Sequence, residues 1–347
     1  MSAGANAFFE TVWRSSNGLL ERGHAHRVGI NLAGERATLQ FGSQDLLQRF
    51  LPGLHHALAP PSDEGLDMRI VMGGTHHPLP DAPAWLTPHL LLAGRGPNMV
   101  VDGLLISFDH ALGALLMLDA TGNRAICWLR EEVRLPAWER AAPLRVLIGM
   151  WLSCHGVALV HAACVGVDSN NTVLLVGRGG SGKSTTALAA LLSGQVFLGD
   201  DYVGVSIGPV GSVHAHALYG SAKATPRTLQ LLPQLHCWQA PDGEVDGEKV
   251  VLYLPASAAI VCSATVRAVV HCCVAPHVAA LLTRTRPAIV FNELISTNSV
   301  QLASALPLLT QTVAHLVRAL PCYQLNLRPD MQSAPAQLRE LMERHGQ

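Results

Sequence analysis

Charged side chains are scarce in this chain. Asp, Glu, Lys and Arg make up 14% of its 347 residues, whereas a soluble domain usually carries about a quarter. The formal net charge is −1 and the basic residues form no run, so we exclude a protein that binds nucleic acid electrostatically. A sparsely charged surface is instead compatible with an oligomer or a partner complex.

Cysteine motifs and zinc-ligand spacings are also absent from the sequence. The eight cysteines include no C-x-x-C pair. Several lie in apolar, strand-like runs, which indicates reduced core thiols in a cytoplasmic protein. Seventeen histidines are present, but none belongs to a set with the spacing of a zinc site. We therefore expect no structural zinc.

A membrane-spanning segment is not expected either. One stretch without Asp, Glu, Lys or Arg lies between Arg145 and Asp168, but polar residues interrupt it. We predict a core helix at Pro143–Cys154 and a core strand at Ala158–Val165 there, rather than a membrane span. Because Met1–Ala7 also lacks the basic and apolar regions of a secretory signal, we expect a cytoplasmic protein.

The sequence pattern changes near residue 136. Residues 1–135 predict a β-rich N-terminal recognition domain, because Arg27–Leu32 and Ala37–Phe41 alternate at strand period and no catalytic pattern occurs. Residues 136–347 predict helices and strands around a glycine-rich loop, and residues 203–295 read as mostly β. The fold class that we expect is mixed α/β (α+β).

The C-terminal end of the chain predicts three further elements. A helix is expected at Ser299–Leu320, broken near Pro307, followed by a strand at Tyr323–Leu327 and a closing helix at Ala334–Arg344.

The most informative motif is Gly177–Ser184, which matches the phosphate-binding loop (P-loop) pattern G-x-x-x-x-G-K-[ST]. Val173–Val176 predicts a buried strand before it and Ser184–Ser193 a helix after it. We therefore predict that loop amides and the helix N-terminus bind phosphates. Lys183 would reach the β- and γ-phosphates, and the Ser184 hydroxyl would join a magnesium ion. The predicted ATP-binding residues are Gly177, Gly179, Gly180, Ser181, Gly182, Lys183, Ser184 and Thr185.

Two acidic residues follow one helix later. Val196–Gly199 predicts a short buried strand that ends at Asp200 and Asp201. Ligands of open α/β sheets bind at the carboxyl ends of strands, so both carboxylates are expected beside the phosphates. One can hold Mg²⁺ and the other can accept a proton from an attacking hydroxyl. The pair therefore indicates a phosphoryl-transfer site.

These motifs resemble those of HPr kinase/phosphorylase and its relatives, which share the nucleotide-binding core of phosphoenolpyruvate carboxykinase. The resemblance covers about residues 161–205. His161–Val165, Gly177–Thr185 and Leu198–Val203 look like the family's histidine-led strand, phosphate loop and acidic pair. It implies a C-terminal P-loop kinase domain beside the β-rich N-terminal domain.

The same resemblance implies roles for individual residues. Asp200 would be the general base toward a serine hydroxyl and Asp201 a magnesium ligand, or the two would exchange or share these roles. His161 would lie beside the phosphates and help to position the reacting groups; the other interpretation is a core histidine at a strand start. With Lys183, these three residues are the predicted catalytic set.

The match to the family weakens elsewhere. Arg178 stands where HPr kinases often carry an acidic or small residue, and their arginine- and asparagine-containing second motif has no clear counterpart. The chain looks more like diverged relatives from peptide-modifying systems, including kinases that phosphorylate the terminal serine of lasso-peptide precursors. That resemblance implies an ATP- and Mg²⁺-dependent serine kinase for a peptide or small protein, and a homo-oligomer.

Two other functions are weighed against the kinase. The first is a nucleotide-sensing binding module without phosphate transfer, against which the presence of both carboxylates argues. The second is a carboxykinase, which needs an added metal site and carboxylate-binding arginines that the sequence does not display at recognisable spacing.

Two lysines after the acidic pair are further candidates for contact with substrate or phosphate. Lys223 ends the small-residue segment Tyr219–Lys223, and Lys249 ends the charged run Pro241–Lys249. Each has the alternative of being merely exposed. The charged run is either a mobile lid over the site or a solvated hairpin tip.

Overall fold

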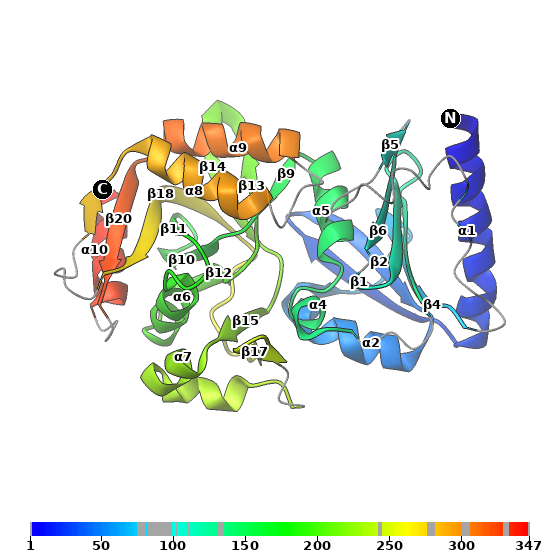
Figure 1. The fold of residues 1–347 in the computed structure, drawn as a ribbon, viewed down its shortest axis with the longest axis horizontal. Coiled ribbons are helices and arrows are strands. Elements are labelled where there is room, and N and C mark those ends of the chain that lie inside the picture. The colour runs from blue at the N-terminus through cyan, green and yellow to red at the C-terminus, as the bar shows by residue number, and fades with distance from the viewer. Residues whose placement is uncertain are drawn as a thin grey trace. The chain divides into compact units, whose positions relative to one another are not determined.

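The computed structural model describes residues 2–74, 81, 83, 99–101, 103–109, 111–130, 135–241, 245–275, 282–299, 306–328 and 333–345. These residues form two compact units, the first ending at His155 and the second beginning at Gly156 (Figure 1). Both units combine helices with mixed sheets, so the predicted mixed α/β class is confirmed. None of the described helices is long and apolar enough to cross a membrane.

An eight-stranded sheet lies at the centre of the first unit. Its strand order is β3-β1-β2-β4-β8-β7-β6-β5, with parallel pairing at β2–β4 and β4–β8 and antiparallel pairing elsewhere. The strands expected at Arg27–Leu32 and Ala37–Phe41 are confirmed as β1 and β2. The strands are β1 (His26–Leu32), β2 (Glu35–Phe41), β3 (Leu58–Ala59), β4 (Leu66–Met72), β5 (Met99–Val101), β6 (Leu104–Asp109), β7 (Ala114–Asp119) and β8 (Arg124–Leu129).

Helices on this sheet extend the first unit beyond the expected division. The helices are α1 (Ser2–Arg22), α2 (Gln44–Phe50), the 3-10 helix η1 (Leu51–Ala57), α4 (Ala137–Ala141) and α5 (Arg145–Cys154). Helix α4 contacts η1, and α5 contacts β7. We placed the division near residue 136, whereas the two compact units divide after α5 because these contacts tie it to the first sheet.

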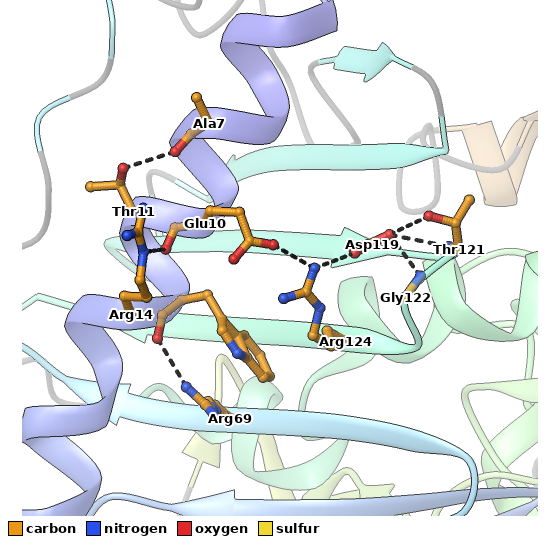
Figure 2. A network of polar contacts seen from close by, with 10 residues as sticks. Ala7, Glu10, Thr11, Arg14, Arg69, Asp119, Thr121, Gly122 and Arg124 are labelled. Carbon is orange, nitrogen blue, oxygen red and sulfur yellow. Dashed lines mark hydrogen bonds and ion pairs between the residues drawn. The ribbon is translucent and has the colours of Figure 1, made fainter.

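Helix α1 is held on the sheet by apolar packing and by a network of charges (Figure 2). Trp13 belongs to the buried cluster that α1 forms with the sheet. Arg124 of β8 donates to Glu10 Oε1 at 2.6 Å and to Asp119 Oδ2 at 2.8 Å. Arg69 of β4 donates to the main-chain oxygen of Trp13 at 2.9 Å. Charges and packing together therefore anchor α1.

A nine-stranded sheet organises the second unit. Its main path is β12-β10-β11-β18-β14-β13-β9, and β20 pairs with both β18 and β19. Helices α8 and α9 pack on one face and α6 and α10 on the other (Figure 1). The strands are β9 (Val157–Val160), β10 (Ala163–Asp168), β11 (Asn171–Val176), β12 (Val196–Gly199), β13 (Val203–Ile207), β14 (Val213–Ala217), β18 (Ser263–Val274), β19 (Leu282–Arg284) and β20 (Cys322–Leu327).

Most of the elements predicted for this unit are confirmed. The strands expected before the glycine-rich loop and before the acidic pair are β11 and β12, and those expected at the C-terminal end are β20 and α10. The helices are α6 (Lys183–Leu192), α7 (Pro226–Leu231), α8 (Pro287–Ser299), α9 (Leu306–Ala319) and α10 (Ala334–His345), with 3-10 turns η2 (Pro209–Gly211) and η3 (Pro233–Trp238).

Two of our expectations for this unit need correction. The single strand expected at Ala158–Val165 is divided at His161–Ala162 into β9 and β10, which lie at distant places in the sheet. Helix α8 lies largely inside the region that we predicted as mostly β. Its apolar residues are numerous enough to read as strand, but Val290 and Leu294, one turn apart, are buried against the sheet.

A separate three-stranded sheet carries the two candidate lysines. Its order is β15-β17-β16, with β15 (Ser221–Ala224), β16 (Val245–Asp246) and β17 (Lys249–Tyr253). The described end of the charged run forms the turn between β16 and β17, with Asp246 paired to Lys249. Residues 242–244 of the proposed lid lie outside the described residues.

Candidate functional site

The glycine-rich loop connects β11 to α6. Gly177, Gly180 and Gly182 have positive φ angles of 146°, 78° and 92°, which L-residues with a side chain rarely adopt. A Cβ atom on Gly177 would lie 2.6 Å from Ser181 Oγ and 2.9 Å from the main-chain oxygen of Cys272. A Cβ atom on Gly180 would meet no heavy atom within 4 Å. The loop is therefore closely packed at its start and open farther along.

Lys183 begins α6 and folds back over the loop. It is 5% exposed, and its Nζ donates to the main-chain oxygens of Gly177 and, at 3.1 Å, of Arg178. Burial lowers the pKa of the Lys183 ammonium, and the charges of Asp200 and Asp201 oppose that effect. Lys183 is thus a buried cation that main-chain carbonyl groups hold and that two nearby carboxylates help to keep charged.

Strand pairing brings the separate motifs to one edge of the sheet. Val176, the last residue of β11, pairs with His271 of β18. Strand β10, which begins just after His161, is antiparallel to β11, and Gly199 at the end of β12 pairs with Cys164 of β10. The loop, His161 and the acidic pair therefore lie at the same edge, although 40 positions separate the first motif from the last.

The two carboxylates have different surroundings. Asp200 is 1% exposed; its Oδ2 accepts the main-chain N–H of Lys223 at 3.0 Å, whereas its Oδ1 is buried and has no donor among the described residues. Burial, and then the charge of Asp201, raise the pKa of Asp200, while the Lys223 N–H and Ser184 side chain offset part of that rise. Asp200 thus keeps one oxygen available to a ligand.

Asp201 has a basic side chain near each of its oxygens. Lys223 Nζ lies 2.7 Å from Asp201 Oδ2, and His161 Nε2 lies 3.9 Å from Oδ1. Burial raises the pKa of Asp201, but the charge of Lys223 and the His161 hydrogen bond outweigh it, so the pKa lies well below its usual range. Asp201 therefore favours the anionic form at neutral pH.

Lys223 contacts both members of the acidic pair, through its main chain to Asp200 and its ammonium to Asp201. Strand β15 holds it there, paired with Val251 of β17. Lys249, two residues earlier on β17, is near enough for its charge to lower the pKa values of Lys183 and Asp200 slightly, after the larger effects of burial and of the carboxylates. Both lysines therefore lie at the predicted site.

His161 lies at the break between β9 and β10. Its ring is 5.7 Å from that of Tyr202, and its Nδ1 is buried without a hydrogen-bond partner among the described residues. Burial lowers the pKa of His161, although the Asp201 hydrogen bond and charge oppose this. The His161 main-chain N–H donates to Asn298 Oδ1 at 2.7 Å, which holds the strand break in place.

The remaining loop residues are placed as follows. Ser181 Oγ is buried without a partner among the described residues. The Thr185 hydroxyl is 2.8 Å from the hydroxyl of Thr228 on α7, so it is engaged by protein. An added Cβ on Gly179 meets no heavy atom within 4 Å. The assignment of these residues to ATP binding stays a prediction.

Three residues near the loop were missed by the sequence reasoning. Glu293 and Asn298 belong to α8, and His271 lies near the end of β18. Glu293 Oε2 is 3.4 Å from Arg178 Nε, and Asn298 is fully buried with its side chain bonded to His161 N–H. Among these three residues, only Glu293 carries a signal in the sequence: it is an isolated acidic residue in an apolar segment. That segment lies largely in the region that we expected to be mostly β.

The residues at this edge fit a magnesium nucleotide. A phosphate and its metal would complete three features of the site: the open space at Gly179 and Gly180, the buried Lys183 ammonium, and the Asp200 oxygen that has no donor within the described ranges. Among the described residues, no three His, Cys, Asp or Glu gather as a metal cluster. Mg²⁺ typically takes one or two protein carboxylates and completes its shell with phosphates and waters, so Ser184 with the acidic pair suffices.

Comparison with known proteins gives structural likenesses only. Neither a protein-family model nor a curated protein matches the sequence. The chain is structurally similar to the HPr(Ser) kinase/phosphatase from Coxiella burnetii, with 12% identity and a TM-score of 0.30. The similarity covers 54% of this chain and 95% of that chain. It does not by itself assign an activity.

Proposed function

We propose that the second unit is an ATP- and Mg²⁺-dependent kinase that transfers the γ-phosphate to a serine hydroxyl of a peptide or small protein. The observation that carries the proposal is the gathering at one sheet edge of a glycine-rich loop, the buried Lys183, the buried Asp200 and the partly buried Asp201. Asp200 keeps one oxygen without a donor among the described residues. Phosphoryl transfer asks a protein mainly for charge neutralisation and positioning, and these groups supply both.

In this proposal each group has a role that its surroundings favour. Lys183 and the loop amides neutralise phosphate charge. Asp200 orients and deprotonates the acceptor hydroxyl, since its pKa is raised by burial and by Asp201 and a base works best with a pKa near the working pH. A magnesium ion, held by Ser184 and Asp201, would supply further charge stabilisation on the phosphates.

The acceptor rests on weaker support than the nucleotide. Serine as the acceptor, and a lasso-type precursor peptide as its carrier, come from the resemblance of residues 161–205 to HPr-kinase-like proteins. Lys223 and Lys249 lie on one small sheet beside the acidic pair, where they would contact phosphate or the acceptor.

Mass spectrometry of a serine-containing peptide library incubated with the protein and Mg-ATP tests the proposal. We expect peptides that are heavier by one phosphate and an equal amount of ADP. Lys183→Ala should lower nucleotide binding and phosphate transfer together. Arg267→Gln should change neither, because Arg267 of β18 lies near the start of β11, at the end of the strands away from the loop. Tight ATP binding without phosphopeptide or ADP would contradict the kinase and favour a nucleotide-sensing module.

A further inference from the structure

Arg178, the second residue of the glycine-rich loop, is anchored at its main chain and exposed at its side chain. Its main-chain oxygen accepts Lys183 Nζ at 3.1 Å, and its side chain is 81% exposed. In the proposed function Lys183 reaches the β- and γ-phosphates. The shared hydrogen bond therefore places Arg178 at the terminal-phosphate end of the loop.

Glu293 holds the Arg178 side chain from one side. Its Oε2 is 3.4 Å from Arg178 Nε, and its own side chain is 9% exposed. Helix α8 fixes the position of Glu293, since Val290 and Leu294 on either side of it are fully buried in the core. The other oxygen, Oε1, is buried without a donor among the described residues. Burial of a carboxylate costs free energy of folding, so the buried position of Glu293 indicates a functional role.

The contact through Nε leaves the guanidinium fork available. An arginine donates through Nε and through two amino groups, and two parallel donors match the oxygens of a phosphate. Among the described residues, the contact of the Arg178 side chain is the one with Glu293, and the rest of the guanidinium is exposed. A lysine has a single side-chain nitrogen, so it could not contact Glu293 through one nitrogen and bind an anion through others.

The positive charges of Arg178 and Lys183 both act on one neighbouring residue, His271. His271 lies at the end of β18, paired with the last residue before the loop. Its pKa is lowered by burial first, while the charge of Glu293 opposes this and the charges of Arg178 and Lys183 add to it. The charges of Arg178 and Lys183 both affect the pKa of His271, which indicates that the two cations lie near each other.

We propose that Glu293 is a positioning residue that holds Arg178 beside the loop, so that the Arg178 guanidinium binds the terminal phosphate of the nucleotide together with Lys183. The inference rests on the proposed function and deepens it. It assigns a role to the loop position at which this chain differs from the HPr-kinase pattern, and to a glutamate on an element that the sequence did not predict as a helix.

The test is calorimetric titration of Mg-ATP and Mg-ADP into the full chain and into Arg178→Gln, Arg178→Lys, Glu293→Gln and the Arg178→Gln/Glu293→Gln double variant. The ratio of the two dissociation constants is the readout, because a general loss of structure would weaken both nucleotides alike. Arg267→Gln is the matched control: Arg267 is also exposed and also anchored through Nε, to the main-chain oxygen of Asn170 at 2.8 Å, on the opposite edge of the sheet.

We expect Arg178→Gln to weaken Mg-ATP binding about tenfold, as loss of a charge-assisted phosphate contact does, and to change Mg-ADP binding by less than about twofold. Arg178→Lys should recover only part of the ATP preference. Glu293→Gln should lower the preference by about threefold, and the double variant should bind Mg-ATP no more weakly than Arg178→Gln alone, because Glu293 acts through Arg178.

Three results would overturn the inference. An unchanged ATP-to-ADP ratio in Arg178→Gln would remove Arg178 from the terminal phosphate. Additive losses in the double variant would show that Glu293 does not act through Arg178. Absence of Mg-ATP binding by the unaltered protein would overturn the proposed function, and this inference with it, whereas the first two results leave the proposed function standing.

Discussion

In the first unit Arg124 lies between Glu10 and Asp119 and donates to both, and the buried Glu139 accepts the main-chain N–H of Leu144 at 2.7 Å. In the second unit Asp200 and Glu293 each keep one buried carboxylate oxygen without a donor among the described residues. In the first arrangement each of the three carboxyl groups accepts a hydrogen bond, and in the second one oxygen of each carboxylate has no donor among the described residues.

This difference separates charges that stabilise a fold from charges that are ready for a ligand. Native proteins rarely leave a buried polar group unpaired, and exceptions call for an explanation such as a missing ion, water or substrate. Both of these exceptions lie near one loop: the charge of Asp200 acts on Lys183, and Glu293 contacts Arg178. Charge substitutions in the first unit should therefore change stability, and those in the second unit should change binding or transfer.

The largest effect is expected from Asp200→Asn. Loss of the general base should lower the rate of phosphate transfer by about 10²- to 10⁴-fold, with Mg-ATP still bound, because Lys183 and the loop are unchanged. Rapid-quench assays of phosphopeptide formation and calorimetry of nucleotide binding measure the two quantities.

Glu139→Gln in the first unit is the matched control for Asp200→Asn. Both residues are buried acids that accept a main-chain N–H, but Glu139 should leave transfer unchanged. Unaltered transfer by Asp200→Asn on a verified substrate would defeat the assignment of the base.

A smaller effect is expected from Arg124→Met, and it should concern stability. The variant loses charge-assisted hydrogen bonds to Glu10 and Asp119 in the network of Figure 2. Because Arg124 is partly exposed, we expect a loss of about 1–2 kcal/mol in the free energy of unfolding. Urea denaturation gives this value, and limited proteolysis should cut α1 sooner.

Arg178→Gln is the counterpart of Arg124→Met in the second unit. It should leave the urea midpoint unchanged and alter nucleotide preference instead. If Arg124→Met lowered nucleotide affinity, or Arg178→Gln lowered stability, the proposed division between the units would be wrong.

A further expected effect is a pH dependence of stability that arises from Glu139. Burial raises the pKa of Glu139 to about 8 from an ordinary value of 4.5, although the Arg145 charge and the Leu144 N–H oppose this. The folded state therefore holds a proton that the unfolded state releases, so stability falls as the pH rises through this window, by at most about 1.4 kcal/mol per pH unit.

Glu139→Gln should flatten this slope, because glutamine does not titrate and can still accept the Leu144 N–H. Urea midpoints of the two proteins from pH 5 to pH 8 provide the measurement. Parallel slopes would show that other groups, Asp200 among them, cause the pH dependence.

Local elements of the second unit were predictable because their signals lie within short segments. The apolar run Val173–Val176 and the acidic pair after Val196–Gly199 define β11, β12 and the loop between strand and helix without reference to the rest of the chain. The elements that were predicted wrongly depend on contacts between distant segments. Helix α8 has an apolar composition close to that of the preceding strands, and its helical period became clear only from the burial of Val290 and Leu294.

The first unit shows the same limit. Strands β1 and β2 were predicted from the alternation of apolar and polar residues. Helix α1 was not predicted, since its polar contacts are made with Arg69 and Arg124 on strands far along the chain. The division between the units likewise depends on the contacts of α4 with η1 and of α5 with β7, and contact is not a property of the local sequence.

The sequence by itself determined the chemistry that this protein carries: a glycine-rich loop that only glycine's φ range permits, a lysine at the start of a helix, and two carboxylates after one strand. Tertiary structure alone decided how those groups differ. Pairing of β15 brought Lys223 to Asp201, while Asp200 Oδ1 has no donor in the part of the chain that the structure describes, and packing of α8 brought Glu293 to Arg178. Hydrogen bonds and burial between distant segments set charge and availability, and no local pattern encodes them.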